Sequence, residues 1–170
     1  ILDGLLENNY TIAGVITAPD RPAGRGQKLH ESAVKVFSKS KGLTVLQPTN
    51  LKDDSFLSDL KSLNANLQIV VAFRMLPKVV WEMPALGTFN LHASLLPDYR
   101  GAAPINWAII NGEKETGVTT FFIDEKIDTG AVILQSKIDI LPSENAGELH
   151  DKLMHLGSEL VLETIQKIEK

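Results

Sequence analysis

The stretch Leu67-Gln68-Ile69-Val70-Val71-Ala72-Phe73 is the clearest indication of the fold. Six of these seven residues are apolar. A short, continuous apolar run is typical of a parallel strand that is covered by protein on both faces. Helical patterns flank the run at Asp53–Leu63 and Pro77–Met83, and the second of these has proline in its first turn. The stretch therefore predicts the central strand of an α/β sheet.

Strand and helix patterns alternate along most of the chain. This alternation predicts an α/β fold, Rossmann-like and doubly wound, with a mostly parallel sheet, helices on both faces and a site at the carboxyl ends of the strands. The predicted strands are Thr11–Thr17, Leu43–Leu46, Leu67–Phe73, Thr88–His92, Val118–Asp124 and Ala131–Ile140. The predicted helices are residues 1–8, Glu31–Lys41, Asp53–Leu63, Pro77–Met83, Ala103–Asn111 and Asn145–Ile168, the last with a capping pair at Asn145 and Glu148. Ala18–His30 is predicted to be a loop.

The composition limits the classes of protein to which the chain can belong. Its 170 residues, 44% of them hydrophobic, suit one domain with a sizeable core. A net charge of −4 excludes a uniformly basic nucleic-acid-binding surface but not a local basic patch. The absence of cysteine excludes disulfides, thiolate zinc sites and cysteine nucleophiles. No apolar run has transmembrane length and no signal peptide is visible, so we expect a cytoplasmic location.

The start of the chain indicates a fragment. Residues 1–8 have the pattern of the end of an amphipathic helix, and no methionine precedes them. In an α/β protein a strand would come before such a helix. We therefore expect that the first strand of the sheet lies outside this sequence.

Three polar side chains mark the predicted site. Asn90 and His92 lie at the end of one predicted strand, and Asp128 lies in the Asp124–Gly130 loop between two others. An amide can hold a developing oxyanion, an imidazole can take or give a proton, and a carboxylate can orient the imidazole. These groups suit the transfer of an acyl group to an amine. Asn-x-His alone is a weak signal, so the neighbouring sequence has to decide.

Two other interpretations of the motifs are rejected. Gly24-Arg25-Gly26 is too short to be a dinucleotide or P-loop fingerprint, so we expect neither NAD nor ATP. The remaining histidines, His30, His150 and His155, are interpreted as surface or helix residues, and no metal site is expected.

Several long motifs occur in a characteristic order: Ala18–Gly26, Asn90–Pro97, Arg100–Ile105, Glu115–Thr119 and Ile127–Gly130. With these motifs the sequence resembles the methionyl-tRNA formyltransferases, a branch of the folate-dependent formyltransferase family, over essentially its whole length. The resemblance implies the formyltransferase fold and a catalytic domain at residues 1–170. It also implies a carboxyl-terminal β-barrel domain, outside this sequence, that helps to grip tRNA.

The resemblance implies roles for the three polar side chains. The family's catalytic Asn, His and Asp match Asn90, His92 and Asp128. The implied donor is 10-formyltetrahydrofolate, and the implied acceptor is the α-amino group of methionine on initiator tRNA. The neutral amine would attack the formyl carbon while the Asn90 amide and protonated His92 hold the oxyanion. Asp128 would pair with His92, and a proton would reach folate N10 through His92 or an ordered water.

Further positions are implied to bind the two substrates. The implied folate contacts are Ser94, Leu95, Leu96, Pro97, Phe73, Arg74, Met75, Leu76, Asp124, Glu125, Lys126 and Ile127. The implied tRNA contacts are Arg21, Arg25 and Lys28, in a basic loop that enters the acceptor end, where arginine suits phosphates and unpaired bases. The resemblance also implies a monomer with a role in translation initiation, and no membrane partner.

Alternatives remain open. Formyltransferases that act on an amino-sugar nucleotide or on glycinamide ribonucleotide share the Asn-x-His and Asp-x-Gly elements. The amino-terminal domain of a folate dehydrogenase is a weaker alternative. A noncatalytic folate- or RNA-binding domain is the alternative of another class, but mere binding has no need for an acid–base group beside an amide.

Overall fold

The structure is a computed structural model, and it describes residues 1–23, 28–72 and 74–170. The helices are α1 (Leu2–Glu7), α2 (Ala33–Ser40), α3 (Asp54–Ser62), α4 (Lys78–Trp81), α5 (Pro104–Ile110) and α6 (Ala146–Ile168). The strands are β1 (Val15–Ile16), β2 (Arg21–Ala23), β3 (Lys28–His30), β4 (Val45–Leu46), β5 (Gln68–Val71), β6 (Thr88–His92), β7 (Glu115–Phe122) and β8 (Val132–Asp139).

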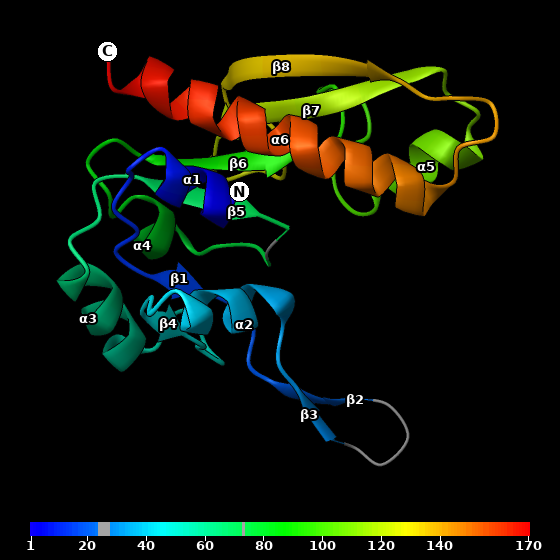
Figure 1. The fold of residues 1–170 in the computed structure, drawn as a ribbon. Helices are drawn as coiled ribbons and strands as arrows, with labels where there is room; N and C mark the ends of the chain where they lie inside the picture. The colour runs from blue at the N-terminus through cyan, green and yellow to red at the C-terminus, as the bar shows by residue number, and fades with distance from the viewer. Residues whose placement is uncertain (24–27, 73) are drawn as a thin grey trace.

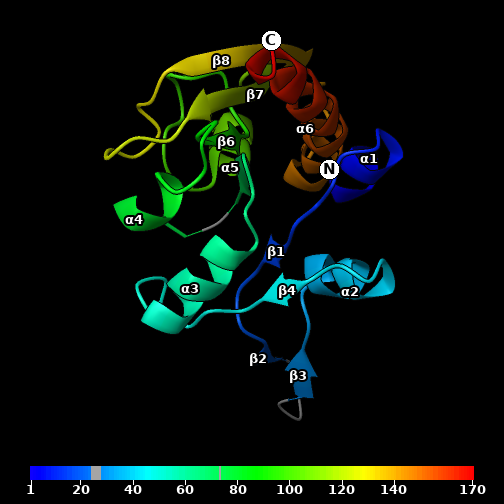
Figure 2. The ribbon, with the colours of Figure 1, turned by 90° about the vertical axis from the view of Figure 1, so that its left-hand side faces the viewer.

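Four strands form the main sheet, in the order β5-β6-β7-β8 (Figure 1). β5 and β6 run parallel, and Val70 pairs with Asn90 in their register. β1 and β4 form a separate parallel pair, and β2 and β3 form an antiparallel hairpin. Helices α1 and α6 lie on one side of the main sheet and α4 lies on the other (Figure 2). The predicted α/β, Rossmann-like class is confirmed.

The second half of the main sheet is antiparallel, whereas the sequence predicted a mostly parallel sheet. β7 runs antiparallel to both β6 and β8. The segment between β7 and β8, residues 123–131, contains no helix. A parallel pair needs a long crossover, usually helical, while a loop is enough to join antiparallel strands. The chain therefore returns antiparallel at this point.

A large part of the core lies between the main sheet and α6, and a separate cluster includes Phe56 and Leu60 of α3 and Val80 of α4. Every residue of β7 from Thr116 to Phe121 is buried, as expected for a strand with a neighbour on each edge. α6 turns an apolar face toward it that includes Leu149 and Val161, both 0% exposed. The predicted capping pair is confirmed: the Asn145 side chain accepts from the Glu148 backbone N–H at 3.1 Å, and the Asn145 N–H donates back to Glu148 Oε2 at 2.9 Å. Local and tertiary signals therefore agree on this helix.

The predicted loop Ala18–His30 contains the hairpin β2–β3. Arg21 pairs with His30 and Ala23 with Lys28. Arms of three residues are too short to show an alternating pattern in the sequence, so the hairpin was not predicted. Residues 24–27, with the predicted tRNA contact Arg25, lie outside the described residues.

Gly117→Ala is expected to lower the free energy of unfolding. A Cβ at position 117 would lie 2.1 Å from Ser136 O and 2.6 Å from Leu95 Cδ2. Because Ser136 O belongs to the β8 backbone, the two strands would have to separate, and overpacking of this kind costs about 1–3 kcal/mol. Urea denaturation followed by circular dichroism measures the change.

Gly4→Ala is the matched control for that substitution. Its new Cβ would meet only the Ser158 hydroxyl at 3.2 Å and a Leu162 methyl at 3.8 Å, and the hydroxyl can rotate away. We expect stability to be unchanged or slightly raised, because alanine favours helix. An equal loss in both variants would contradict the packing argument.

Candidate active site

A cavity of about 870 Å³ lies where β5 and β6 end. Its walls come from the end of β5, from β6, from the segments 101–106 and 123–128, and from α6. Asn90, His92 and Asp128 all line it. Small-molecule sites in proteins usually enclose about 300–1,000 Å³ with mostly apolar walls and a few polar groups. The cavity is therefore of the right size and kind for a substrate.

His92 is held at both ring nitrogens. Its Nε2 lies 2.8 Å from the carbonyl oxygen of Tyr99, and its Nδ1 lies 3.7 Å from Asp128 Oδ2. The side chains of His92 and Asp128 are only 8% and 12% exposed. Since a carbonyl oxygen can only accept, Nε2 must carry a hydrogen. Nδ1 is then the nitrogen that can gain or lose a proton beside the carboxylate.

Asp128 is fixed by the segment that follows Tyr99. Its Oδ2 accepts from the backbone N–H of Gly101 at 2.7 Å, and its carbonyl oxygen accepts from Arg100 Nε at 2.8 Å. These bonds join two loops that are far apart in the sequence. They hold the carboxylate beside the imidazole.

Asn90 presents its amide on the same face of β6 as His92, because the two residues are two apart in a strand. Its Oδ1 is buried and has no hydrogen-bond partner among the described residues. A buried polar atom left unpaired costs about 1–3 kcal/mol. A native structure that tolerates this cost commonly does so at a functional position.

Strained backbone gathers around the cavity. Tyr99, Ala103 and Asp128 have φ angles of 55°, 55° and 52°, in the left-handed region that residues with a Cβ rarely adopt. Ala72, at the end of β5, has φ 47°. Such residues cost on the order of 1–3 kcal/mol each and cluster at functional sites. At Tyr99 the turn follows the strand that carries His92 and brings the carbonyl back to its ring.

The loop after β7 is organised by Asp124. Its Oδ1 accepts from Lys126 N and from Thr129 Oγ1, both at 2.9 Å. Glu125, at the cavity wall, pairs with Lys78 of α4 at 3.0 Å. This carboxylate raises the pKa of Lys78, which stays charged. The Asp124 carboxylate thus makes its hydrogen bonds to Lys126 and Thr129 of its own loop, and this loop forms part of the cavity wall.

The predicted folate positions divide into two groups. The first, Arg74, Met75, Leu76, Asp124, Glu125, Lys126 and Ile127, lines the cavity. Arg74 donates to Pro48 O at 2.5 Å and to Thr49 O at 2.9 Å, so it also holds the loop after β4. The second group, Ser94, Leu95, Leu96 and Pro97, does not line the cavity. Phe73 lies outside the described residues, and all these binding roles stay predictions.

Three contributors to this arrangement were missed by reasoning from the sequence. The Tyr99 carbonyl and the Gly101 N–H are backbone groups, which any residue type would supply. Only the positive φ of Gly101, 84°, relates to its residue type. His150, interpreted as a surface residue, is exposed but lines the cavity from α6.

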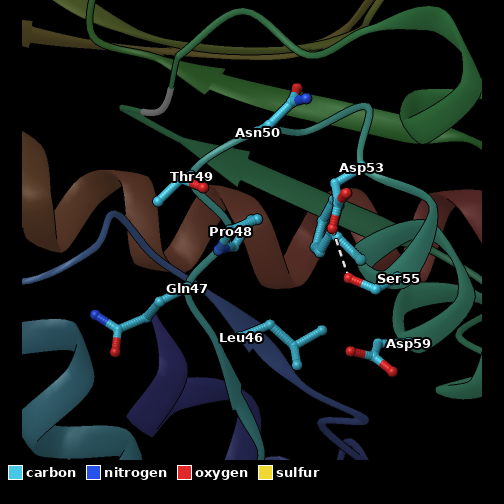
Figure 3. A pocket seen from close by; sticks show the side chains of 9 residues that line it. Leu46, Gln47, Pro48, Thr49, Asn50, Asp53, Ser55 and Asp59 are labelled. Carbon is cyan, nitrogen blue, oxygen red and sulfur yellow. Dashed lines mark hydrogen bonds between the residues drawn. The ribbon is translucent and has the colours of Figure 1, made fainter.

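A smaller pocket of about 270 Å³ lies beside α3 (Figure 3). Figure 3 shows Ser55 directed toward Asp53, to which its hydroxyl donates at 2.5 Å. Two residues that line this pocket, Pro48 and Thr49, already use their backbone carbonyls to accept hydrogen bonds from Arg74. We therefore interpret it as a feature of packing.

Metal ligands and membrane spans can be assessed over residues 1–23, 28–72 and 74–170. Within these ranges no cluster of His, Asp or Glu side chains has the arrangement of a metal site. None of the helices there combines the length and apolar character needed to cross a membrane.

The known proteins that the chain resembles include the following two. The chain is 73% identical over 169 residues to methionyl-tRNA formyltransferase of Flavobacterium johnsoniae, covering 99% of this chain and 54% of that protein. It is 60% identical over 167 residues to methionyl-tRNA formyltransferase of Bacteroides fragilis, covering 98% and 52%. The chain spans about half the length of the curated relatives it matches.

A solved structure and a family match complete the comparison. The crystal structure of phosphoribosylglycinamide formyltransferase from Bacillus halodurans is similar with a TM-score of 0.83 at 20% identity, covering 98% of this chain and 88% of that one. At this identity the similarity concerns the fold alone. Residues 1–165 match the family described as "Formyl transferase". Since that match covers nearly the whole chain, the chain belongs to the formyl transferase family.

Proposed function

We propose that this chain is the catalytic part of a methionyl-tRNA formyltransferase. It transfers the formyl group of 10-formyltetrahydrofolate to the α-amino group of methionine carried by initiator tRNA. The observation that carries the proposal is the meeting of Asn90, His92 and Asp128 at one cavity, with His92 held between Tyr99 and Asp128. The names of the relatives at 73% and 60% identity support the acceptor.

The Asn90 amide serves both reacting groups in this proposal. The amine of methionine attacks the formyl carbon, and the formyl oxygen becomes an oxyanion. Asn90 Nδ2 donates a hydrogen bond to that oxyanion as its charge develops. The buried Oδ1, unpaired among the described residues, accepts from the attacking amine and so orients its lone pair. In this proposal, an N–H of the substrate amine donates the hydrogen bond that Asn90 Oδ1 does not receive from the described residues.

His92 carries the proton in this proposal. Nε2 keeps its hydrogen on the Tyr99 carbonyl, so Nδ1 takes the proton that the amine loses. The same proton passes to folate N10, and the bond between N10 and the formyl carbon breaks with a neutral leaving group. While the imidazole is charged, Asp128 stabilises it from 3.7 Å.

The cavity holds the folate in this proposal. Val70, Val71, Ile123 and Ile127 supply apolar wall, and the segment 123–128, which also lines the cavity, would supply hydrogen-bonding groups from its backbone. A flat pterin ring has stackable faces and polar edges, which suits such a wall. Ser94–Pro97 are further predicted folate contacts in this proposal, although they are not among the residues that line the cavity.

The acceptor is recognised by the basic hairpin in this proposal. Arg21, Arg25 and Lys28 contact the acceptor end of the tRNA, through phosphates and unpaired bases. We also propose a cytoplasmic, monomeric enzyme of translation initiation. The predicted β-barrel domain that grips tRNA stays a prediction.

Glycinamide ribonucleotide and amino-sugar nucleotides are the alternative acceptors. A formylation assay with the full-length protein, offering each of them beside methionyl-tRNA, tests the proposal. We expect kcat/KM to be highest for methionyl-tRNA, because the relatives at 73% and 60% identity are enzymes named for that acceptor. A higher value for either small acceptor would overturn the proposed substrate.

Asn90→Asp is expected to lower kcat by about 10²–10³ with little change in folate affinity. The substitution keeps an oxygen at the Oδ1 position and removes the donor to the oxyanion. Steady-state kinetics and folate binding by fluorescence measure the two effects. Asn66→Asp is the control, because it makes the same chemical change at an exposed position. Asn66 lies before β5, at the end of that strand away from the cavity. Turnover near that of the unaltered enzyme in Asn90→Asp would refute the assignment.

Arg25→Ala is expected to raise KM for methionyl-tRNA and to leave folate affinity unchanged. A lost charge-assisted contact to phosphate is worth about 1.5–3 kcal/mol, so the rise should be about tenfold or more. Initial rates at varied tRNA and varied folate separate the two effects. Lys61→Ala, an exposed basic residue on α3, is the control. A matching loss of folate affinity would count against the acceptor role.

A further inference from the structure

A buried lysine sits at the base of the hairpin β2–β3. Lys35 of α2 is 8% exposed. Its Nζ lies 2.5 Å from Asp20 Oδ2 and 3.0 Å from Glu31 Oε1. Asp20 immediately precedes β2, and Glu31 immediately follows β3. One ammonium group therefore holds both the point where the hairpin leaves the body and the point where it returns.

Two further contacts tie the same base to the body. The second oxygen of Asp20 accepts from Gln47 Nε2 at 2.8 Å, and Gln47 also donates to Ala18 O at 2.9 Å. The hydroxyls of Thr17 and Ser32 lie 3.1 Å apart and share a hydrogen bond. The base is thereby fixed against the start of α2 and the end of β4. Figure 1 shows the hairpin extending past both, on the side at which β5 and β6 end.

The three charges reinforce one another. The hydrogen bond from Lys35 lowers the pKa of Asp20, and those from Lys39 and Lys35 lower the pKa of Glu31. Asp20 and Glu31 in turn raise the pKa of Lys35. All three groups stay ionised at neutral pH. Because the carboxyl pKa values are lowered, the ion pairs weaken only as the pH falls into the acid range.

We propose that Lys35 is a positioning residue for the acceptor. It fixes the direction in which the hairpin β2–β3 leaves the body, so that the hairpin meets the acceptor end in one orientation. The inference rests on the proposed function, since it assumes that the hairpin contacts tRNA. A hairpin that is already fixed does not have to be ordered when tRNA binds, which lowers KM.

Lys35→Met in the full-length enzyme tests the inference. We expect KM for methionyl-tRNA to rise about tenfold, while kcat and KM for folate change by less than about twofold. Lys35→Arg should restore KM, because a guanidinium can bind two carboxylates. Lys39→Met is the control, since Lys39 is 57% exposed and pairs only with Glu31 in the described structure. Its KM should stay within about twofold of the unaltered enzyme.

Loss of folding would obscure the result, because removing one partner of a buried ion pair is strongly destabilising. The triple variant Lys35→Met, Asp20→Asn, Glu31→Gln removes the whole clamp, that is, the ion pairs of Lys35 with Asp20 and Glu31. Among the described residues it leaves no buried charge unpaired, and only the exposed Lys39 loses its carboxylate partner. It should show the same rise in KM while circular dichroism shows a folded protein. Residues 1–170 contain no cysteine, so once any cysteine in the rest of the full-length enzyme is replaced by serine, spin labels at His30→Cys and Lys61→Cys report the distance between the hairpin and α3. The distance distribution between them should broaden in both clamp variants and stay narrow in Lys39→Met.

Three results would overturn the inference. A fall in kcat, or an equal rise in KM for folate, would show a general structural role. An unchanged KM for tRNA in both clamp variants, with the expected rise in Arg25→Ala, would overturn the clamp while leaving the proposed function standing. If KM for methionyl-tRNA were unchanged in Arg25→Ala as well, the result would refute both the positioning role of Lys35 and the proposed contact between the hairpin and tRNA.

Discussion

The hydroxyl of Thr119 joins three segments of the chain behind the candidate site. Thr119 is 0% exposed and pairs with His92 in the register of β6 and β7. Its Oγ1 donates to Ser94 O at 2.7 Å and accepts from Leu96 N at 3.1 Å and from Gln135 Nε2 at 2.9 Å. A hydroxyl has one donor and two acceptor positions, so this one is fully used. β7, β8 and the segment after β6 meet at this atom.

The position of His92 depends on that junction. Because Ser94 and Leu96 are held against β7, the chain leaves β6 in one direction and turns at Tyr99. The Tyr99 carbonyl then reaches His92 Nε2. The Tyr99 hydroxyl donates to Glu113 and accepts from Asn111, so the turn is held at its outer end as well. The strain of the left-handed Tyr99 is therefore offset by bonds on both sides, and the imidazole is held in one tautomer.

The sequence predicted those parts of the fold that local pattern determines. The capping pair and apolar face of α6, and the placement of Asn90 and His92 two apart on a strand, follow from periodicity over adjacent residues. The antiparallel β7 and β8 could not be predicted in this way, because a strand's direction depends on its connection and not on its own residues. The ion pair of Lys35 with Asp20 could likewise not be predicted, because it spans 15 residues and leaves no periodic trace. The pair of Lys35 with Glu31, four residues away, does follow helical spacing.

The groups at the candidate site also differ in how far the sequence could predict them. Asn90, His92 and Asp128 could be proposed from the sequence because their side chains are of the types that the proposed chemistry needs and because they stand in motifs that resemble those of the formyltransferases. The groups that orient them could not, because the Tyr99 carbonyl and the Gly101 N–H are supplied by backbone whose course only the fold determines. The predicted folate contacts at Ser94–Pro97 stay predictions, although these residues are not among those that line the cavity.

Under the proposed function, the chemistry and the choice of acceptor belong to different parts of the molecule. The cavity acts on a formyl group and an amine, and methionyl-tRNA, glycinamide ribonucleotide and amino-sugar nucleotides all provide such an amine. A TM-score of 0.83 at 20% identity shows that this fold is retained while most of the sequence changes. The fold by itself therefore does not select among acceptors, and in the proposal the hairpin contributes to that selection. In the proposal, fixing the base of the hairpin at Lys35 holds the hairpin in one direction. A tRNA acceptor end offers such an element a run of phosphates, whereas a small nucleotide offers only a few.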